Sequence, residues 1–102
     1  MKKLMNWKVG DNMFLKCYHV TESKGKETLL INLQDIKAIQ KRYISYKEMF
    51  VITVCYDDSV SYTIFANNDE GAVNYCFDRV TSAISANKFL IDITDLATAF
   101  DI

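Results

Sequence analysis

The stretch VCYDDSVSYTIF, residues 54–65, decides how the middle of this chain folds. Large apolar side chains alternate with small or polar ones on both sides of Asp57 and Asp58, which is the pattern of two β-strands joined by a turn. Strand side chains point alternately to the two faces of a sheet, so the length of the turn determines which residues share a face. It also determines whether the two aspartates are a chemical site or part of a bend.

A three-residue turn at residues 57–59 produces the more favourable register. It places Val54 opposite Tyr62 and Ile52 opposite Ile64, so one face of the hairpin is wholly apolar. A two-residue turn would instead set apolar side chains opposite polar ones. Because each buried apolar side chain contributes roughly 1.5–3 kcal/mol, the three-residue turn is predicted. The aspartates then lie at an exposed tip as turn-forming residues.

Further strands are predicted ahead of this hairpin. The β-rich segments before the Asp57 turn are residues 12–21, 27–33, 36–44 and 49–56. Turns are predicted between them at ESKGK (22–26), at Gln34 and Asp35, and at SYKE (45–48), because these segments contain the glycine and polar residues that favour chain reversal.

The period of the apolar residues changes after Asn67. Apolar side chains then recur at spacings of four, three and four residues, the pattern of an amphipathic helix. They are Val73, Phe77, Val80 and Ile84. A helix over about 68–86 is therefore predicted, with Asn67 as its N-cap, Glu70 completing a capping box and Asn87 ending it in left-handed geometry.

These elements predict a single α+β domain over residues 1–102. We expect an antiparallel twisted sheet or half-barrel of five to six strands, packed by the helix at about 68–86. A short C-terminal strand at residues 89–93 and a short helix from Thr94 to Phe100 complete it, with an extended or partner-dependent tail as the alternative to this helix. The predicted core consists of Leu30, Ile52, Val54, Tyr62, Ile64, Val73, Phe77, Val80 and Ile84.

The composition excludes several classes of protein. Half of the residues are hydrophobic and a quarter are charged, which is typical of a globular domain and not of a disordered chain. No apolar run approaches the ~20 residues that a membrane span needs, so no membrane partner is expected. Three cysteines make a poor disulfide framework and are typical of a reducing compartment, so we expect a cytoplasmic protein.

The residues that usually perform chemistry form no recognisable constellation. Cys17 and His19 are the only closely spaced pair of soft metal ligands, and on a strand they point in the same direction instead of at each other. Phosphate-binding glycine loops and the common hydrolase motifs do not occur in the sequence. We therefore expect no enzyme activity, no cofactor and no metal site.

The segment KAIQKRYISYK, residues 37–47, mixes cations with aromatic rings. The candidate binding residues are Lys37, Lys41, Arg42, Tyr43, Tyr46 and Lys47. Cations that hold phosphates beside rings that stack on bases are typical of single-stranded nucleic-acid surfaces. Strand geometry puts Lys37, Lys41 and Tyr43 on one face and Arg42 on the other. The other interpretation is a solvated strand kept from edge pairing by its lysines, which the acidic pI of about 5.7 favours.

Protein binding is the leading functional hypothesis. Six Tyr, six Phe and one Trp are more aromatic residues than one helix and one sheet can cover. The surplus apolar surface is what a protein target or a second copy of the chain would bury. We predict a small non-enzymatic cytosolic interaction module, an adaptor or inhibitor of the kind that bacteria and phages encode, with a homodimer as one form and nucleic-acid binding as the alternative function.

The order of elements resembles two families of small domains. LLINLQDIKAIQKR, MFVITVCYDDSVSYTIF and the helix after them follow the plan of the β-roll of LytTR DNA-binding domains and of the sheet and C-terminal helix of pleckstrin-homology-like domains. A LytTR domain would carry basic residues after the helix, where this chain has Asp92 and Asp95. A pleckstrin-like domain has seven strands, and five or six are predicted here. The resemblance is therefore one of element order.

Overall fold

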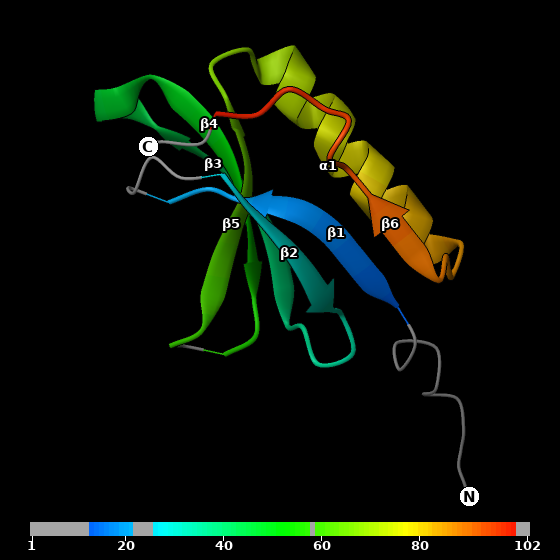
Figure 1. Cartoon of the computed structure of the whole chain (residues 1–102). Coiled ribbons are helices and arrows are strands. Elements are labelled where there is room, and N and C mark those ends of the chain that lie inside the picture. Colours follow the sequence, from blue (N-terminus) through cyan, green and yellow to red (C-terminus); the bar gives the residue numbers. More distant parts are fainter. Residues whose placement is uncertain (1–12, 22–25, 58, 100–102) are drawn as a thin grey trace, which may run out of the picture.

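The computed structural model describes residues 13–21, 26–57 and 59–99, and confirms the α+β class. Six strands and one long helix follow one another along the chain (Figure 1). They are β1 (Phe14–His19), β2 (Glu27–Asn32), β3 (Ala38–Ile44), β4 (Met49–Cys55), β5 (Ser61–Asn67), α1 (Glu70–Ser85) and β6 (Leu90–Asp92). Each described strand lies within a segment that the sequence predicts as a strand, except that β5 extends to Asn67.

The strands form two three-stranded sheets instead of the expected single antiparallel sheet. One has the order β2-β1-β6 and the other the order β3-β4-β5. All pairs are antiparallel except β1 and β6, which are parallel, so the first sheet is mixed. Parallel neighbours need a long crossover, and the intervening strands and α1 supply it here. The sheets do not close into a barrel, although Val20 N–H at the end of β1 donates to Thr63 O at 2.9 Å.

The β4–β5 hairpin has the predicted register near its turn and departs from it farther away. Val54 pairs with Tyr62, as predicted, and Asp57 accepts hydrogen bonds from the Ser59 and Val60 amides at 2.8 and 3.0 Å. Asp58 lies outside the described residues. Ile52, however, pairs with Phe65 and not with Ile64, because a β-bulge gives β5 one extra residue. The bulge allows Ile64 and Phe65 both to be buried.

The core lies between α1 and the inner faces of the two sheets. Val73, Cys76 and Val80 on α1 have no exposed surface. The predicted core residues that are fully buried are Ile52, Val54, Ile64, Val73 and Val80; Tyr62, Phe77 and Ile84 are partly buried against the same core. Helix α1 also lies beside β6, and the two are joined by a hydrogen bond of 2.8 Å from the Arg79 guanidinium to Asp92 O.

Leu30 is the predicted core residue that the structure contradicts. Its side chain is 63% exposed. The β1–β2 register pairs Leu30 with Lys16, and the two side chains lie on the outer face of the sheet. Leu29 and Ile31, its neighbours in β2, contribute to the core instead. Because alternate strand residues face opposite sides, only one of the adjacent leucines can be buried.

The C-terminal end of α1 follows the prediction and the N-terminal end differs from it. Asn87 is left-handed with φ 57°, and the amides of Asn87 and Lys88 donate to the last helical carbonyls at 3.0 Å. The N-cap is Asp69, whose carboxylate accepts the Gly71 amide at 3.1 Å, and not Asn67. Asn67 instead accepts the Asp69 amide at 2.8 Å and ends β5.

The segment after β6 is not the predicted helix over the described residues 94–99. It makes a turn after Asp92, whose carboxylate accepts both the amide and the hydroxyl of Thr94, and then extends along the end of β5. Ala99 N–H donates to Ala66 O at 2.8 Å. The backbone of the tail therefore bonds to the backbone of β5 instead of forming hydrogen bonds within a helix of its own. Among residues 13–21, 26–57 and 59–99, no helix combines the length and apolar character that a membrane span requires.

Candidate binding surfaces

The outer edge of β2 is an open strand edge. Strand β2 is the last strand in the order β2-β1-β6, and no strand among the described residues pairs with its other side. Leu33 N–H donates to Met13 O at 3.0 Å, so the odd-numbered residues of β2 bond to β1. In an antiparallel pair the alternate residues point their amides and carbonyls the other way, which here are Thr28, Leu30 and Asn32.

The middle of this edge, residues 28–31, lacks the usual features that prevent strand pairing. Between Glu27 and Asn32 the strand reads Thr-Leu-Leu-Ile, without charge, proline or glycine. The ladder between β1 and β2 is regular, with no bulge in β2. Edge strands that are not meant to pair commonly carry lysine, proline or a bulge. The edge of β2 is therefore suited to receive another strand.

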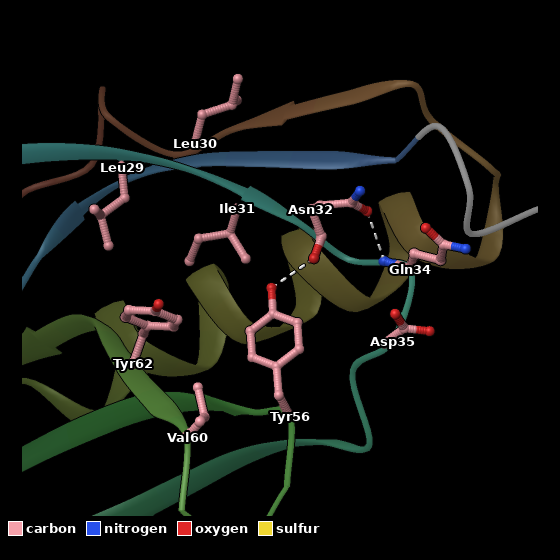
Figure 2. Close-up of a pocket in the computed structure, with 9 residues that line it drawn as sticks. All are labelled: Leu29, Leu30, Ile31, Asn32, Gln34, Asp35, Tyr56, Val60 and Tyr62. Carbon is pink, nitrogen blue, oxygen red and sulfur yellow. Dashed lines mark hydrogen bonds between the residues drawn. The ribbon is translucent and has the colours of Figure 1, made fainter.

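A groove lined by both apolar and polar side chains lies beneath this edge, between β2 and the β4–β5 hairpin (Figure 2). Its volume is about 420 Å³. Figure 2 shows Leu29 and Ile31 pointing from β2 toward Tyr62 and Tyr56 of the hairpin, while Leu30 points to the other side of the strand. We call this feature the inner groove. Its lining residues are Leu29, Leu30, Ile31, Asn32, Gln34, Asp35, Tyr56, Val60 and Tyr62.

One hydrogen bond joins the two walls of the inner groove. The Tyr56 hydroxyl donates to the carbonyl oxygen of Asn32 at 2.5 Å. Burial raises the pKa of Tyr56, and the neighbouring Tyr62 raises it further, so the hydroxyl remains a protonated donor at neutral pH. The rings of Tyr56 and Tyr62 meet edge to face, with centroids 6.1 Å apart. The hairpin wall is therefore held in a definite position relative to the β2 edge.

A second apolar surface lies on the outer face of the same sheet. Leu30, Phe89 and Leu90 are exposed there, and Phe14 meets the Phe89 ring edge to face at 6.0 Å. These four residues, which we call the outer patch, line a hollow of about 480 Å³ together with Lys16, Thr28 and Leu29. The open edge of β2 thus has apolar surface on both faces of its sheet.

The predicted basic and aromatic residues are divided among several environments. The Lys41 ammonium donates to the Asn74 side chain at 2.5 Å and lies 5.3 Å from the centre of the Phe77 ring, so α1 engages it. The Tyr43 ring packs against Phe50, with centroids 4.6 Å apart. The structure therefore uses two of the six residues in packing within the domain.

The other four predicted residues do not gather on one surface. Arg42 lies on the face of β3 opposite to Lys41, as strand alternation requires. Lys37 immediately precedes β3, at the end of the strand far from Tyr43. Hydrogen bonds from Ser59 lower the pKa of the nearby Asp57 most, and the charge of Lys37 lowers it further. Tyr46 and Lys47 lie together on a single 3-10 turn, with the ammonium 5.8 Å from the ring centre.

The two buried thiols are poor candidates for chemistry. Burial raises the pKa of Cys17 and of Cys76 to about 12, so neither forms a thiolate at neutral pH. His19 is bonded to Glu27, with Nδ1 3.1 Å from the carboxylate. In the part of the chain that the structure describes, no three His, Cys, Asp or Glu side chains converge as metal ligands.

The sequence analysis missed the β2 edge because it placed Leu30 in the core. The alternation itself contained the signal: Leu29, Ile31 and Leu33 form an apolar set, whereas Leu30 alternates with Thr28 and Asn32. The more apolar set is the one that a sheet buries. That Leu30 is left at an open edge could not be read from β2 alone, since it depends on which strands pair with β2.

Comparisons of this chain with protein-family models, with curated proteins and with solved structures gave no match. The resemblance in element order to LytTR and pleckstrin-homology-like domains therefore has no support from them. The six described strands, in two sheets, also differ from the seven strands expected of a pleckstrin-like domain. The geometry of the surfaces above remains as the basis for a functional conclusion.

Proposed function

We propose that the chain is a small non-catalytic module that binds protein by accepting an extended segment along the edge of β2. The observation that supports this most is the open β2 edge, with the inner groove on one face of its sheet and the apolar hollow at the outer patch on the other. Strand addition to an exposed edge is a common mode of peptide recognition. In it, main-chain hydrogen bonds supply affinity and side-chain hollows supply selectivity.

The geometry of the edge defines the chemistry of the segment. Its backbone would pair with the outward amides and carbonyls of Thr28, Leu30 and Asn32. Alternate side chains of an added strand point to opposite faces. One set would enter the inner groove beside Tyr62, and the other would cover Leu30 in the outer patch. We therefore expect an uncharged or weakly charged segment with apolar side chains on both faces.

The proposal places this module in the cytoplasm, as an adaptor or an inhibitor of a protein target. Cys17, Cys55 and Cys76 are all free thiols, as is typical of a reducing compartment. The pKa of about 12 for Cys17 and Cys76 supports a structural role for these two residues and not a nucleophilic one.

Selection from a library of displayed linear peptides, with the immobilised full chain as bait, tests the proposal. We expect enriched peptides to have alternating apolar residues and to shift the backbone NMR signals of residues 28–32. Leu30→Lys should weaken their binding at least tenfold, because a charge then occupies the apolar contact. Tyr75→Lys is the control, since Tyr75 is 60% exposed on α1 and lines neither hollow. Peptides that bind equally well to both variants, or none enriched at all, would contradict the binding of a foreign protein segment at β2.

Nucleic-acid binding is a second candidate because of the β3–β4 connection. Tyr46 presents an almost fully exposed ring there, Lys47 lies beside it, and Tyr43 is half-exposed nearby. A ring next to a cation is able to stack on a base while pairing with a phosphate. Titration with labelled single- and double-stranded oligonucleotides at two salt concentrations tests this candidate. It predicts binding that salt weakens and that Tyr46→Ala reduces, and no binding at low salt would reject it.

A further inference from the structure

We infer that the segment bound at the β2 edge is β2 of a second copy of this chain, paired antiparallel about a two-fold axis at Leu30. The inference rests on the proposed function, because it uses the same edge and names its partner. A two-fold interface needs a surface that is complementary to itself. The β2 edge has this property in its hydrogen bonds, its apolar side chains and its charges.

Hydrogen bonding restricts where the axis can lie. The outward amides and carbonyls belong to alternate residues, Thr28, Leu30 and Asn32. With the axis at Leu30, this residue faces itself and Thr28 faces Asn32 of the other copy, so outward groups meet outward groups. The Asn32 carbonyl oxygen already accepts the Tyr56 hydroxyl, and its second lone pair can accept an amide of the other copy without breaking that bond. Two three-stranded sheets would then join into one continuous sheet.

The apolar side chains match in the same register. Leu30 is 63% exposed in the single chain and would pack against Leu30 of the other copy. On the opposite face of the sheet, Leu29 would lie opposite Ile31 of the other copy, above the inner groove. Centring the axis on Leu29 would instead oppose Ile31 to Glu27 and Leu30 to Thr28, so apolar contacts would be lost.

The bounds of β2 distinguish the remaining register. With the axis at Leu30, residues 28–32 of the two copies pair within the strand. With the axis at Ile31, only residues 30–32 would pair, because the chain turns at Gln34 and Asp35. In the register centred on Leu30, the end of one β2 at Lys26 lies beside this turn in the other copy, where the exposed Lys26 and Asp35 have opposite charges.

Cysteine crosslinking tests the register, with Cys55→Ser as the background because Cys55 is the accessible native thiol. Hydrogen-bonded antiparallel partners have Cα atoms about 5.5 Å apart, within the range of about 4.4–6.8 Å that a disulfide bridges. Leu30→Cys should therefore crosslink two copies under mild oxidation. Thr28→Cys is the matched control: in this register its two copies are four residues out of line, roughly 13 Å along the strand. Adding Asn32→Cys to Thr28→Cys should restore the crosslink.

Analytical ultracentrifugation over a concentration series tests the interface itself. We expect the full chain to dimerise, Leu30→Lys to raise the dimer dissociation constant at least tenfold, and Tyr75→Lys to leave it unchanged. Circular dichroism checks that both variants fold. A monomer at every concentration, a dimer that Leu30→Lys does not weaken, or efficient crosslinking of Thr28→Cys alone would overturn the inference. If the chain is monomeric and selected peptides still bind at β2, the inference fails while the proposed function stands. If no peptide binds and Leu30→Cys still crosslinks, the binding of foreign segments fails while pairing between two copies stands.

Discussion

Replacement of Thr53 by valine is expected to stabilise this protein. Thr53 lies in β4 with 6% of its surface exposed, and its hydroxyl has no hydrogen-bond partner among the described residues. A buried hydroxyl without a partner costs about 1–3 kcal/mol in lost hydration. Valine keeps the β-branched shape and suits a strand at least as well. We expect Thr53→Val to raise the free energy of unfolding by about 1–2 kcal/mol. This is less than the full cost of the unpaired hydroxyl, because the added methyl group will not pack perfectly in the space that the hydroxyl occupied.

Thr98→Val is the matched control, because the same chemical change there should have the opposite effect. The Thr98 hydroxyl oxygen accepts the Ala66 amide at 2.8 Å and lies 3.2 Å from the Ala66 carbonyl. Ala66 is completely buried, so removal of the hydroxyl leaves a buried amide without a partner. Such a loss costs about 1–3 kcal/mol, and Thr98→Val should lower the free energy of unfolding by that amount.

Urea unfolding followed by circular dichroism measures both effects. For a small domain the free energy falls by about 1–3 kcal/mol per molar urea, so Thr53→Val should move the midpoint upward by roughly 0.3–2 M with an unchanged slope. Thr98→Val should move it downward. A lower midpoint for Thr53→Val, or a shift of the same sign for both variants, would refute the reasoning that hydrogen-bond pairing decides the contribution of each hydroxyl.

Two further predictions concern titration. With a thiol reagent at pH 8, the half-buried Cys55 should react in the native protein. Cys17 and Cys76 should react only after unfolding, because burial raises the pKa of each to about 12. Rapid modification of more than one thiol in the native protein would contradict this prediction. Hydrogen bonds from Arg79 lower the pKa of Asp95, so the ionised form is favoured by folding, and the stability it adds is present above the ordinary carboxyl pKa and lost as the pH falls through the lowered value. The difference in unfolding midpoint between the wild type and Asp95→Asn should therefore shrink as the pH falls from about 6 to 3, and a constant difference would argue against it.

The local elements of the fold were predictable because they depend on neighbouring residues. The stripe from Val73 to Ile84 predicts α1, and alternation around the Asp57 turn predicts the hairpin and the pairing of Val54 with Tyr62. The left-handed Asn87 was predictable for the same reason, since few residues tolerate that conformation. The N-cap was not, because Asn67 and Asp69 are equally suitable and the end of β5 occupies the first.

The candidate site depended on contacts between distant segments. Leu30 is an edge residue because β2 pairs only with β1 among the described strands, while β3, the next strand along the chain, joins the other sheet. From the sequence, Lys41 is a candidate to bind phosphate, whereas in the structure its ammonium contacts Asn74 and Phe77 of α1. Neither fact has a signal within ten residues of the side chain concerned.

The amino-acid sequence by itself determined the α+β class, the positions of the strands and helix, and the reversal at Asp57, because periodicity and turn chemistry act over a few residues. Only the tertiary structure decided the division into two sheets, the parallel β1–β6 pair, the bulge beside Ile52 and the open edge at Leu30. These features follow from which segments meet across long stretches of chain, and that choice is made by the burial of the whole core at once.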